Sequence, residues 1–324
     1  MSGKPAVAVV TGGLGYIGQT LAAALQAQGM PVVAVDRRAV PAQVAGLEVW
    51  RGRVGDAGLW QALAARYRLR VVYHCAGLIS VAESVAEPGP YFRENVSEGL
   101  AMLEALRGLG PVPVVFSSSA AVYGVPAAVP IPEEAPLAPV NPYGVTKRVF
   151  EEALAAYGRA YGLPWVALRY FNAAGTAYGV RERHEPETHV IPRMAAALQG
   201  GEAPVVFGTD YPTPDGSAVR DYIHVADLVD AHLKAAAYLE AGGPSLALNL
   251  GSGRGTSVLE LAAALIRVSG RAAEPRRAPR RPGDPPALVA AIGRARQVLA
   301  WEPVRSADLE GLLAEVWADV SARA

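Results

Sequence analysis

Short apolar runs alternate with longer stretches of helical spacing along the first 170 residues of the chain. The short runs are rich in valine and alanine and contain few polar residues, as in strands buried on both faces of a parallel sheet. They predict strands at Ala6–Thr11, Val32–Asp36, Val71–Ala76, Val112–Ser117 and Trp165–Tyr170. The expected fold class is therefore α/β, a Rossmann-type doubly wound parallel sheet with helices on both faces.

The pattern becomes less regular after Tyr170. Two stretches rich in Gly, Pro, Asp and Thr, GTAYGVRERHEPETH and GTDYPTPDGSAVRDY, are typical of surface loops that carry binding groups. The run SLALNL predicts one more strand, and SVLELAAALIRV predicts a helix that opens with a capping box of Ser257 and Glu260. A last amphipathic helix is expected near Leu309–Val320. A smaller mixed α/β region should therefore accompany the sheet.

Composition and charge narrow the range of partners. Lys and Arg number 30, as do Asp and Glu, so the formal net charge is zero. Nothing provides the positive field that nucleic acid or an anionic membrane would need, and no apolar run approaches the ~20 residues of a spanning helix. The single Cys75 cannot form an internal disulfide, the N-terminus lacks a signal-peptide pattern, and the histidines have no metal-ligand spacing. We expect a cytoplasmic protein without a metal, a nucleic acid partner or a membrane partner.

The turn after the first predicted strand has the sequence TGGLGYIG. Gly13, Gly15 and Gly18 fit G-x-G-x-x-G, and Gly12, Gly15 and Gly18 fit the related G-x-x-G-x-x-G. Glycines at these positions allow a tight turn, close approach of backbone N–H groups to a pyrophosphate, and close packing of helix on strand. A glycine-rich turn without a ligand would show the same pattern, so neighbouring residues are needed to tell whether this turn binds a dinucleotide.

Asp36 supplies that context. It ends the second predicted strand, eighteen residues after Gly18, where a carboxylate accepts hydrogen bonds from the adenosine ribose hydroxyls of a dinucleotide. Because Asp36 would repel a 2′-phosphate, NAD is predicted rather than NADP. Arg37 and Arg38 keep NADP open, since NADP sites use a nearby arginine.

The segment NPYGVTK predicts a helix start with chemistry on it. Asn141 is a good N-cap and Pro142 suits the first helical position, so Tyr143 and Lys147 lie one turn apart on one face. A nearby ammonium, a nicotinamide cation and the positive helix end favour the phenolate, and a lowering of roughly three pKa units would make Tyr143 a base near neutrality. Alone, the two residues would fit a solvated surface pair better. Beside a nucleotide-binding turn and the serine run FSSSAAVYG, which ends in Ser119, they are predicted to be catalytic.

At this point the sequence resembles the extended short-chain dehydrogenases/reductases and, within them, the UDP-glucose 4-epimerase family. The similarity is carried in order by TGGLGYIG, HCAGLISVAESVAEP, ENV, FSSSAAVYG, NPYGVTK, LRYFNAAG, EPETHVIP, GTDYPTPDGSAVRDYIHVADL, NLGSGRGTSVLEL and RRPGDPP, which extend over almost the whole chain. It implies a tightly held NAD and hydride transfer from the C4 of UDP-galactose or UDP-glucose. Rotation of a transient 4-keto sugar and return of hydride from bound NADH to the other face would follow. We also expect a homodimer.

The resemblance implies roles for individual residues. Tyr143 would be the base, Ser119 its hydrogen-bonding partner, and Lys147 would tune the tyrosine and hold the nicotinamide ribose. The expected cofactor contacts are Gly12, Gly15, Tyr16, Ile17, Gly18, Asp36, Asp56, Ala76, Gly77, Asn95, Ser117, Tyr143, Lys147 and Tyr170. The expected UDP-sugar contacts are Ser119, Tyr143, Asn172, His189, Val190, Phe207, Arg220, Tyr222, Val258, Arg281, Asp284 and Leu288.

The same resemblance divides the chain. Residues 1–170 should form the NAD-binding domain, rejoined by about 218–250, and residues 171–217 and 251–324 should form the UDP-sugar-binding domain. Two positions depart from the family pattern. Ile79 stands where the family usually has a lysine that reaches the cofactor phosphates. Leu288 stands where hexose-restricted members carry a bulky tyrosine, so we expect some activity on UDP-N-acetylhexosamines.

Other functions stay open at the level of sequence. One alternative is a 4-epimerase for UDP-N-acetylglucosamine or a UDP-pentose. Related dehydratases place an acidic pair after the serine strand end, where this chain has Ala120 and Ala121, so dehydration is not expected. A non-catalytic, NAD-binding regulatory protein is a further alternative, because folds of this kind host many functions. The presence of Ser119, Tyr143 and Lys147 argues against it.

Overall fold

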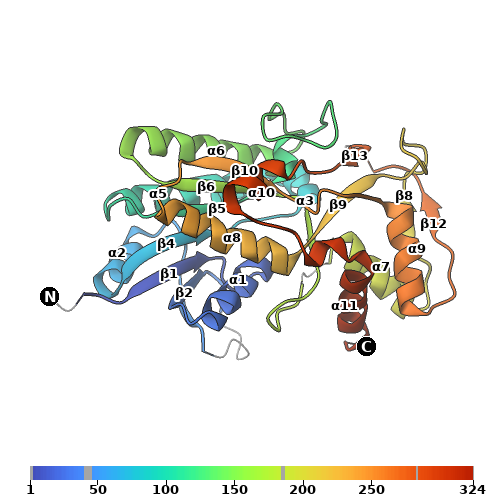
Figure 1. Ribbon diagram of the computed structural model, residues 1–324, viewed down its shortest axis with the longest axis horizontal. Coiled ribbons are helices and arrows are strands. Elements are labelled where there is room, and N and C mark those ends of the chain that lie inside the picture. The colour runs from blue at the N-terminus through green and yellow to red at the C-terminus, as the bar shows by residue number, and fades with distance from the viewer. Residues whose placement is uncertain (1–2, 40–45, 184–186, 282–283, 324) are drawn as a thin grey trace.

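A sheet of seven parallel strands forms the centre of the molecule (Figure 1). The computed structural model describes residues 3–39, 46–183, 187–281 and 284–323. The strand order is β10-β6-β5-β4-β1-β2-β3, so the chain runs outward from β1 in one direction, then returns and continues from β4 in the other. The predicted doubly wound fold is therefore confirmed. The strands are β1 (Ala6–Thr11), β2 (Val32–Asp36), β3 (Glu48–Arg51), β4 (Arg68–His74), β5 (Val114–Ser119), β6 (Trp165–Tyr170) and β10 (Leu246–Leu250).

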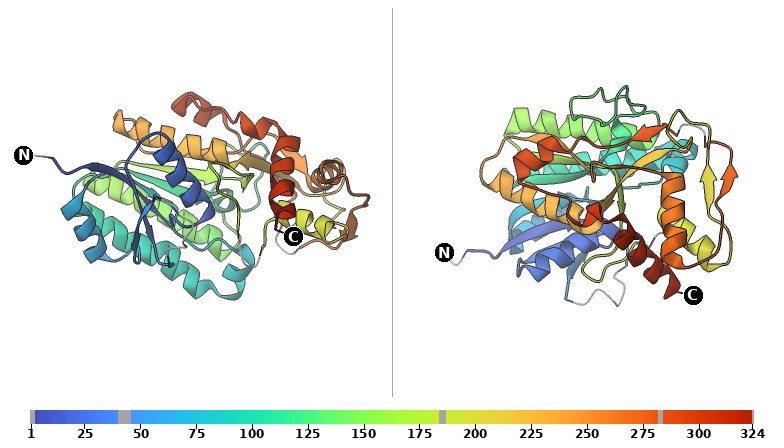
Figure 2. Two further views of the ribbon diagram at one scale, coloured as in Figure 1. Left: turned by 90° about the horizontal axis from the view of Figure 1, so that it is seen from below. Right: turned by 45° about the vertical axis from the view of Figure 1, so that its right-hand side comes forward.

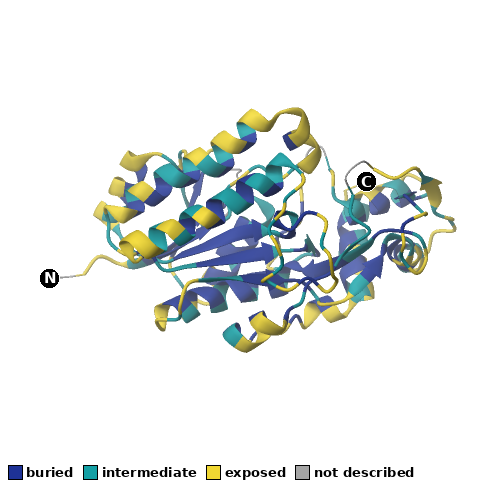
Figure 3. Cartoon of the chain, turned by 90° about the horizontal axis from the view of Figure 1, so that it is seen from above, coloured by how far each residue is buried: buried dark blue, intermediate teal, exposed yellow. Residues whose placement is uncertain are grey.

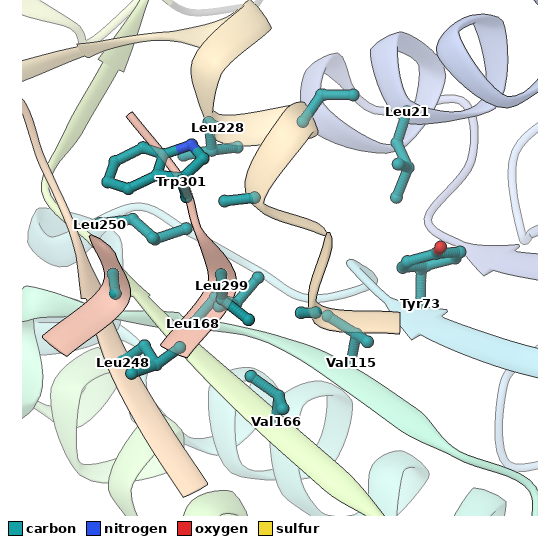
Figure 4. Close-up of a cluster of buried hydrophobic side chains, with 14 of the residues drawn as sticks. Leu21, Tyr73, Val115, Val166, Leu168, Leu228, Leu248, Leu250, Leu299 and Trp301 are labelled. Carbon is teal, nitrogen blue, oxygen red and sulfur yellow. The ribbon is translucent and has the colours of Figure 1, made fainter. Parts of the chain in front are cut away.

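Helices cover both faces of this sheet, which is why its strands are apolar almost throughout. Val7 and Val9 of β1 belong to one buried cluster, and Ala8 and Val10 belong to the other. The first cluster lies under α2 (Ala57–Arg66), α5 (Glu98–Arg107) and α6 (Pro142–Tyr161); the second lies under α1 (Tyr16–Ala27), α8 (Val225–Glu240) and α10 (Gly293–Leu299). Figure 3 shows the buried strands between helices with exposed outer faces, and Figure 4 shows part of the second cluster.

A smaller group of elements projects from one end of the sheet (Figures 1 and 2). Its third apolar cluster is enclosed by α7 (Val190–Gln199), α9 (Val258–Ser269) and α11 (Leu309–Ser321). Two small sheets complete it. In one, β8 (Val205–Phe207) pairs with β12 (Arg276–Ala278), and in the other, β9 (Val219–His224) pairs with β7 (Asn172–Ala174), β11 (Gly255–Ser257) and β13 (Ala287–Leu288). The remaining short helical segments are α3 (Val81–Ala86), α4 (Pro88–Phe92), the π-helical turn η1 (Arg93–Ser97), and the 3₁₀ turns η2 (Ala120–Val122) and η3 (Arg305–Ala307).

Most predicted elements are present, with informative shifts. Strands β1, β2 and β6 have the predicted bounds, whereas β5 begins and ends two residues later than predicted. Pro113 has no N–H to donate to a neighbouring strand, so the ladder begins at Val114 and extends to Ser119. Strand β4 begins at Arg68, earlier than predicted. The prediction missed this start because Arg68 and Arg70 interrupt the apolar pattern there. Strand β3 was missed, and β9 lies partly in a stretch predicted to be loop.

The predicted domain boundaries stay a prediction. Their last segment, 251–324, divides between two cores in the structure. Leu299 and Trp301 pack with Leu228 beneath the large sheet, and Trp301 Nε1 donates to the carbonyl oxygen of Asp227 at 2.8 Å. Helix α11, by contrast, packs on α7 and α9. Among the described residues, no helix is both long and apolar enough to cross a membrane.

Candidate active site

The start of helix α6 lies directly against the turn that follows β5. Asn141 caps the helix, its side chain accepting a hydrogen bond from Gly144 N at 2.8 Å, as predicted. A Cβ at Gly144 would lie 2.5 Å from the carbonyl oxygen of Ala121, so glycine is what permits the close approach. The approach brings Tyr143 to the carboxyl end of β5, where the Ser119 hydroxyl acts to lower the pKa of Tyr143.

Lys147 follows Tyr143 by one helical turn and is only 4% exposed. Its ammonium donates to the carbonyl oxygen of Ser117 at 2.8 Å. The ammonium nitrogen also lies 4.9 Å from the ring centre of Phe116 and 5.8 Å from that of Tyr143. Burial lowers the pKa of Lys147 to about 8, against the opposing effects of Cys75 and Glu151.

The lowered pKa predicted for Tyr143 includes the charge of a bound nicotinamide and stays a prediction. In the protein alone, burial raises the pKa of Tyr143, and the Ser119 hydroxyl only partly opposes this. The Lys147 ammonium donates its hydrogen bond to the carbonyl oxygen of Ser117 rather than to Tyr143. The protein therefore positions the tyrosine, but a further positive charge is needed to make it a base near neutrality.

The glycine turn between β1 and α1 has the geometry of an anion site. Gly12 has φ +66°, and a Cβ there would lie 2.8 Å from backbone atoms of Ala76. A Cβ at Gly18 would lie 2.3 Å from the carbonyl oxygen of Gly12, so the helix packs tightly on the turn. Gly15 caps α1 without a side-chain hydrogen bond, and the first helical turn has no acidic residue. Backbone N–H groups of that turn are thus available to a phosphate.

Tyr16 and Ile17 begin α1 directly after this turn. The Tyr16 hydroxyl donates to the carbonyl oxygen of Gly175 at 2.6 Å, which links the glycine turn to the segment after β7. Ile17 packs against the second core cluster. Tyr16 therefore joins α1 to the segment after β7, and it is also an expected cofactor neighbour.

Asp36 lies at the carboxyl end of β2 and is almost fully buried. Although burial acts to raise it, hydrogen bonds from Arg38 and Leu14 leave the pKa of Asp36 below its ordinary value. The carboxylate is therefore ionised at neutral pH. Asp56, the other expected carboxylate, is exposed and caps α2 by accepting from Gly58 N at 2.9 Å.

The loop after β4 closes this side of the site. A Cβ on Gly77 would lie 3.0 Å from Asn95 Oδ1 and 3.6 Å from Lys147 Nζ, so glycine leaves room beside the lysine. Asn95 accepts from Leu78 N at 2.7 Å and donates to Leu78 O and Thr146 Oγ1. Its amide is thus engaged by the protein, and Asn95 borders the site by holding the loop. Ile79 is 43% exposed in the same loop.

A buried hydroxyl network lies behind the catalytic residues. The Tyr170 hydroxyl donates a hydrogen bond to Ser117 Oγ at 2.8 Å and is also hydrogen-bonded with Nε2 of His232. Nδ1 of His232 lies 2.8 Å from the carbonyl oxygen of Leu228. Burial lowers the pKa of His232 to about 4, so the ring is neutral. Sequence reasoning missed His232 because a histidine in a helix has no motif that points to a distant tyrosine.

One group of expected substrate contacts gathers on the small sheet around β9. Asn172 lies opposite Tyr222, and Leu288 lies opposite Arg220. Asn172 Nδ2 donates to Asp221 O, and Arg220 Nη1 donates to Val219 O and Pro285 O, all at 2.9 Å. The Tyr222 hydroxyl is buried without a hydrogen-bond partner in the described part of the protein, a cost that a polar ligand group would remove.

A second group lies in the smaller group of elements that projects from the end of the large sheet. The Arg281 guanidinium stacks 4.1 Å from the ring centre of Phe207, and Asp284 N donates to Arg281 O at 3.3 Å. Val190 and Val258 are the first residues of α7 and α9, and Ser257 caps α9 as predicted. Among the described residues, no hydrogen bond joins this group to Tyr143, so a ligand that touches both must extend from the end of β5 to the smaller group of elements.

His189, the N-cap of α7, has an environment that sequence spacing did not predict. Its Nδ1 lies 2.9 Å from Glu182 and 3.0 Å from Glu187. Burial opposes the charge, but the two carboxylates raise the pKa of His189 to about 10. The three groups offer ligand atoms within 4.8 Å of one another. Ion pairing of an imidazolium with two carboxylates accounts for the cluster without a metal.

A surface cavity of about 450 Å³ lies elsewhere, at the far end of α6. Gly158, Arg159, Trp165 and Gly243 are among its lining residues. Fifteen residues of helix separate Gly158 from Tyr143, about 22 Å at 1.5 Å per residue. This cavity contains none of the expected site residues.

Comparisons with a family model, with curated relatives and with solved structures all point to epimerases. Residues 8–251 match the model of the NAD dependent epimerase/dehydratase family. A UDP-glucose 4-epimerase of Azospirillum brasilense is 46% identical over 304 residues, 91% of this chain and 86% of the relative. The structure of UDP-glucose 4-epimerase from Brucella ovis in complex with NAD is 41% identical, covers 97% of this chain and 98% of its own, and superposes with a TM-score of 0.92.

A further solved structure is similar over nearly its full length. It is UDP-glucose 4-epimerase from Stenotrophomonas maltophila with bound NAD and formylated UDP-arabinopyranose, 36% identical with a TM-score of 0.92 over 98% of both chains. The glycine turn, the uncapped start of α1 and the space beside Gly77 fit a dinucleotide such as NAD. On the family match over most of its length, the chain belongs to the NAD dependent epimerase/dehydratase family.

Proposed function

We propose that this protein is a UDP-glucose 4-epimerase, which interconverts UDP-galactose and UDP-glucose. The observation that carries the proposal is the meeting of Ser119, Tyr143 and Lys147 at the carboxyl end of β5, beside a glycine turn suited to a dinucleotide. Ligands of doubly wound sheets bind at this edge, where the strand order reverses. The names of the relatives described above support the same reaction.

The residues of the chain fit a bound NAD along its whole length. The turn Gly12–Gly18 would hold the pyrophosphate, Asp36 the adenosine ribose, and Lys147 with the backbone at Ala76–Gly77 the nicotinamide ribose. When bound, NAD supplies the acceptor for the hydride of the sugar C4 and the donor for its return.

Tyr143 moves the proton in this scheme. Its oxygen accepts the proton of the C4 hydroxyl as the C4–H bond breaks, and it gives the proton back to the C4 oxygen when a C4–H bond forms on the other face. Ser119 donates a hydrogen bond that holds the same sugar oxygen against Tyr143. The Lys147 ammonium adds positive charge below Tyr143 and so favours the phenolate.

The smaller domain would hold the UDP group. Arg220 and Arg281 can each fork onto diphosphate oxygens, Phe207 can pack on uracil, and Asp284 can accept from a ribose hydroxyl. The Tyr222 hydroxyl is the buried group that gains a partner when a substrate binds. We infer that His189, paired with Glu182 and Glu187, stays an imidazolium beside the diphosphate at neutral pH.

Leu288 sets the choice of sugar in this proposal. It is half-buried and packs at the margin of the second core cluster, opposite Arg220. A leucine is shorter than a tyrosine, so we propose that UDP-N-acetylhexosamines are also turned over. The related structure that contains formylated UDP-arabinopyranose keeps UDP-pentoses as the second candidate.

A single parallel assay tests the proposal. Purified protein is incubated with UDP-galactose, UDP-N-acetylgalactosamine and UDP-arabinose, the products are identified by mass spectrometry after sugar-specific separation, and bound NAD is measured per chain. We expect C4 epimers and NAD near one per chain. Bound NAD without any epimer would support the regulatory alternative, and protein without NAD would contradict the proposal.

We also propose that the protein is a cytoplasmic homodimer. The resemblance of the sequence to the UDP-glucose 4-epimerase family supports this proposal. Sedimentation equilibrium of the holoenzyme should give twice the chain mass of 33.8 kDa. A single-chain mass at micromolar concentration would contradict the dimer.

A further inference from the structure

Arg38 closes onto the carboxylate that is expected to hold the adenosine ribose. Its Nε lies 3.0 Å from Asp36 Oδ1, and its Nη2 lies 2.9 Å from Oδ2. The backbone N–H groups of Arg38 and Leu14 donate to the same two oxygens, each at 3.0 Å. A carboxylate offers about four acceptor positions. The protein itself therefore occupies all of those on Asp36.

A ribose hydroxyl has to compete with Arg38 for this carboxylate. The two backbone donors belong to the turns after β1 and β2 and cannot leave without rebuilding them. The guanidinium is on a long side chain that is 55% exposed. It also lies near the phosphate turn, because a Cβ at Gly15 would be 3.7 Å from Arg38 Nη2. Arg38 is thus the group that must move when the hydroxyls of NAD engage Asp36.

The pairing also changes the charge that a cofactor meets. Asp36 alone repels a 2′-phosphate, but Asp36 and Arg38 together carry no net charge. Arg51 on β3 lies opposite Asp36 in the strand register, and within the described ranges it has no carboxylate partner. Its Nε is held near the carbonyl oxygen of Arg37, at 3.4 Å. Two guanidinium groups, whose planar donors match phosphate oxygens, therefore lie at the same corner.

We propose that Arg38 makes the adenosine ribose site accept both NAD and NADP. Asp36 receives the ribose hydroxyls of NAD once the guanidinium moves away, whereas Arg38 and Arg51 receive the 2′-phosphate of NADP. The inference rests on the proposed NAD site and names Arg38 as its specificity-determining residue. Removing Arg38 leaves Asp36 unopposed, so the variant excludes NADP and holds NAD at least as firmly.

The test uses the holoenzyme and needs no apoprotein. Purified protein is incubated with an equimolar excess of isotope-labelled NAD and NADP, desalted and denatured in acid, and the released nucleotides are quantified by mass spectrometry. Uptake of labelled NAD measures exchange itself, and the nucleotides bound as purified are quantified in parallel. Arg38→Ala is compared with Arg37→Ala, the matched control, because Arg37 pairs with Glu94 at 3.1 Å rather than with Asp36.

We expect wild type to take up NADP at about one tenth of the level of labelled NAD or more, and Arg38→Ala to lower that ratio by roughly tenfold or more, the value of a lost charged hydrogen-bonding pair. Arg37→Ala should stay within about twofold of wild type. A wild-type preference for NAD of about a hundredfold or more, or an unchanged ratio in Arg38→Ala, would overturn the inference. If neither labelled nucleotide is taken up, the nucleotides bound to the purified protein are compared instead. Wild-type protein that contains NAD but no NADP would then overturn the inference. Protein with no nucleotide at all would contradict the proposed function instead.

Discussion

The ammonium of Lys147 lies 2.8 Å from the carbonyl oxygen of Ser117, and this contact joins helix α6 to strand β5 two residues before Ser119. Lys147 is one helical turn beyond Tyr143, so the same contact fixes how the start of α6 meets the end of β5. The three catalytic candidates thus come from two elements that buried hydrogen bonds join, from Lys147 to Ser117 and from Ser118 to Glu151. The position of Tyr143 is set by packing, whereas its acidity depends on charge nearby.

The pH dependence of turnover should follow the charge of Lys147. Burial lowers the pKa of Lys147 to about 8, so the ammonium is present below that pH and is lost above it. Because its charge favours the Tyr143 phenolate, we expect kcat for UDP-galactose to decline above about pH 8. In Lys147→Arg the guanidinium stays charged. That variant should be slower at pH 7 but show no decline between pH 8 and 10, and equal declines in both proteins would refute this role.

Glu151 should stabilise the protein far more than its neighbour Glu152. The Glu151 carboxylate lies 2.7 Å from the Arg169 guanidinium, both side chains are 6% exposed, and Ser118 Oγ also donates to Glu151 at 2.5 Å. Glu151→Ala leaves a buried guanidinium unpaired, and we expect a loss of about 3–5 kcal/mol in the free energy of unfolding.

Glu152→Ala is the matched control for this prediction. Its pair with Arg148, at 3.3 Å, is largely exposed. The expected change is within about 0.5 kcal/mol. Urea unfolding of both variants at one NAD concentration measures the difference. Equal losses in the free energy of unfolding would show that the buried pair stabilises the protein no more than the exposed pair.

The sugar specificity should respond to the size of residue 288. Leu288→Tyr fills the space that we assign to an N-acetyl group. We expect kcat/KM for UDP-N-acetylgalactosamine to fall by about tenfold or more, while that for UDP-galactose changes by less than about threefold. Leu288→Met, which conserves volume, should leave both values near wild type. Absence of wild-type activity on the N-acetylated sugar, or equal losses on both, would refute the assignment.

Local signals made part of the site predictable from sequence. The glycine turn, the strand end at Asp36 and the cap at Asn141 each depend on residues within a few positions of one another. Steric and capping rules act between residues that are close together in the chain, so these features can be recognised in the sequence. The start of β5 near Pro113 was less clear because the apolar run already begins at Val112, before the first strand residue, Val114.

Long-range contacts made the rest unpredictable. The amide of Asn95 is engaged by Leu78 and Thr146, and His232 meets Tyr170, although these partners are far apart in the chain. The raised pKa of Tyr143 is likewise a result of burial, which depends on how separate segments pack. Even Arg38, two residues from Asp36, could be identified only as a candidate NADP residue until its side chain was seen on the carboxylate.

Proton transfer by the Tyr143 hydroxyl is tested most directly by Tyr143→Phe. The ring remains, so the fold and the bound NAD should be retained. Tyr161→Phe, at the exposed end of the same helix, serves as the control. The measurement is kcat for UDP-galactose together with NAD per chain. We predict a loss of about 10²–10⁴-fold in kcat at unchanged NAD content, with Tyr161→Phe like wild type; wild-type turnover in Tyr143→Phe would contradict the account.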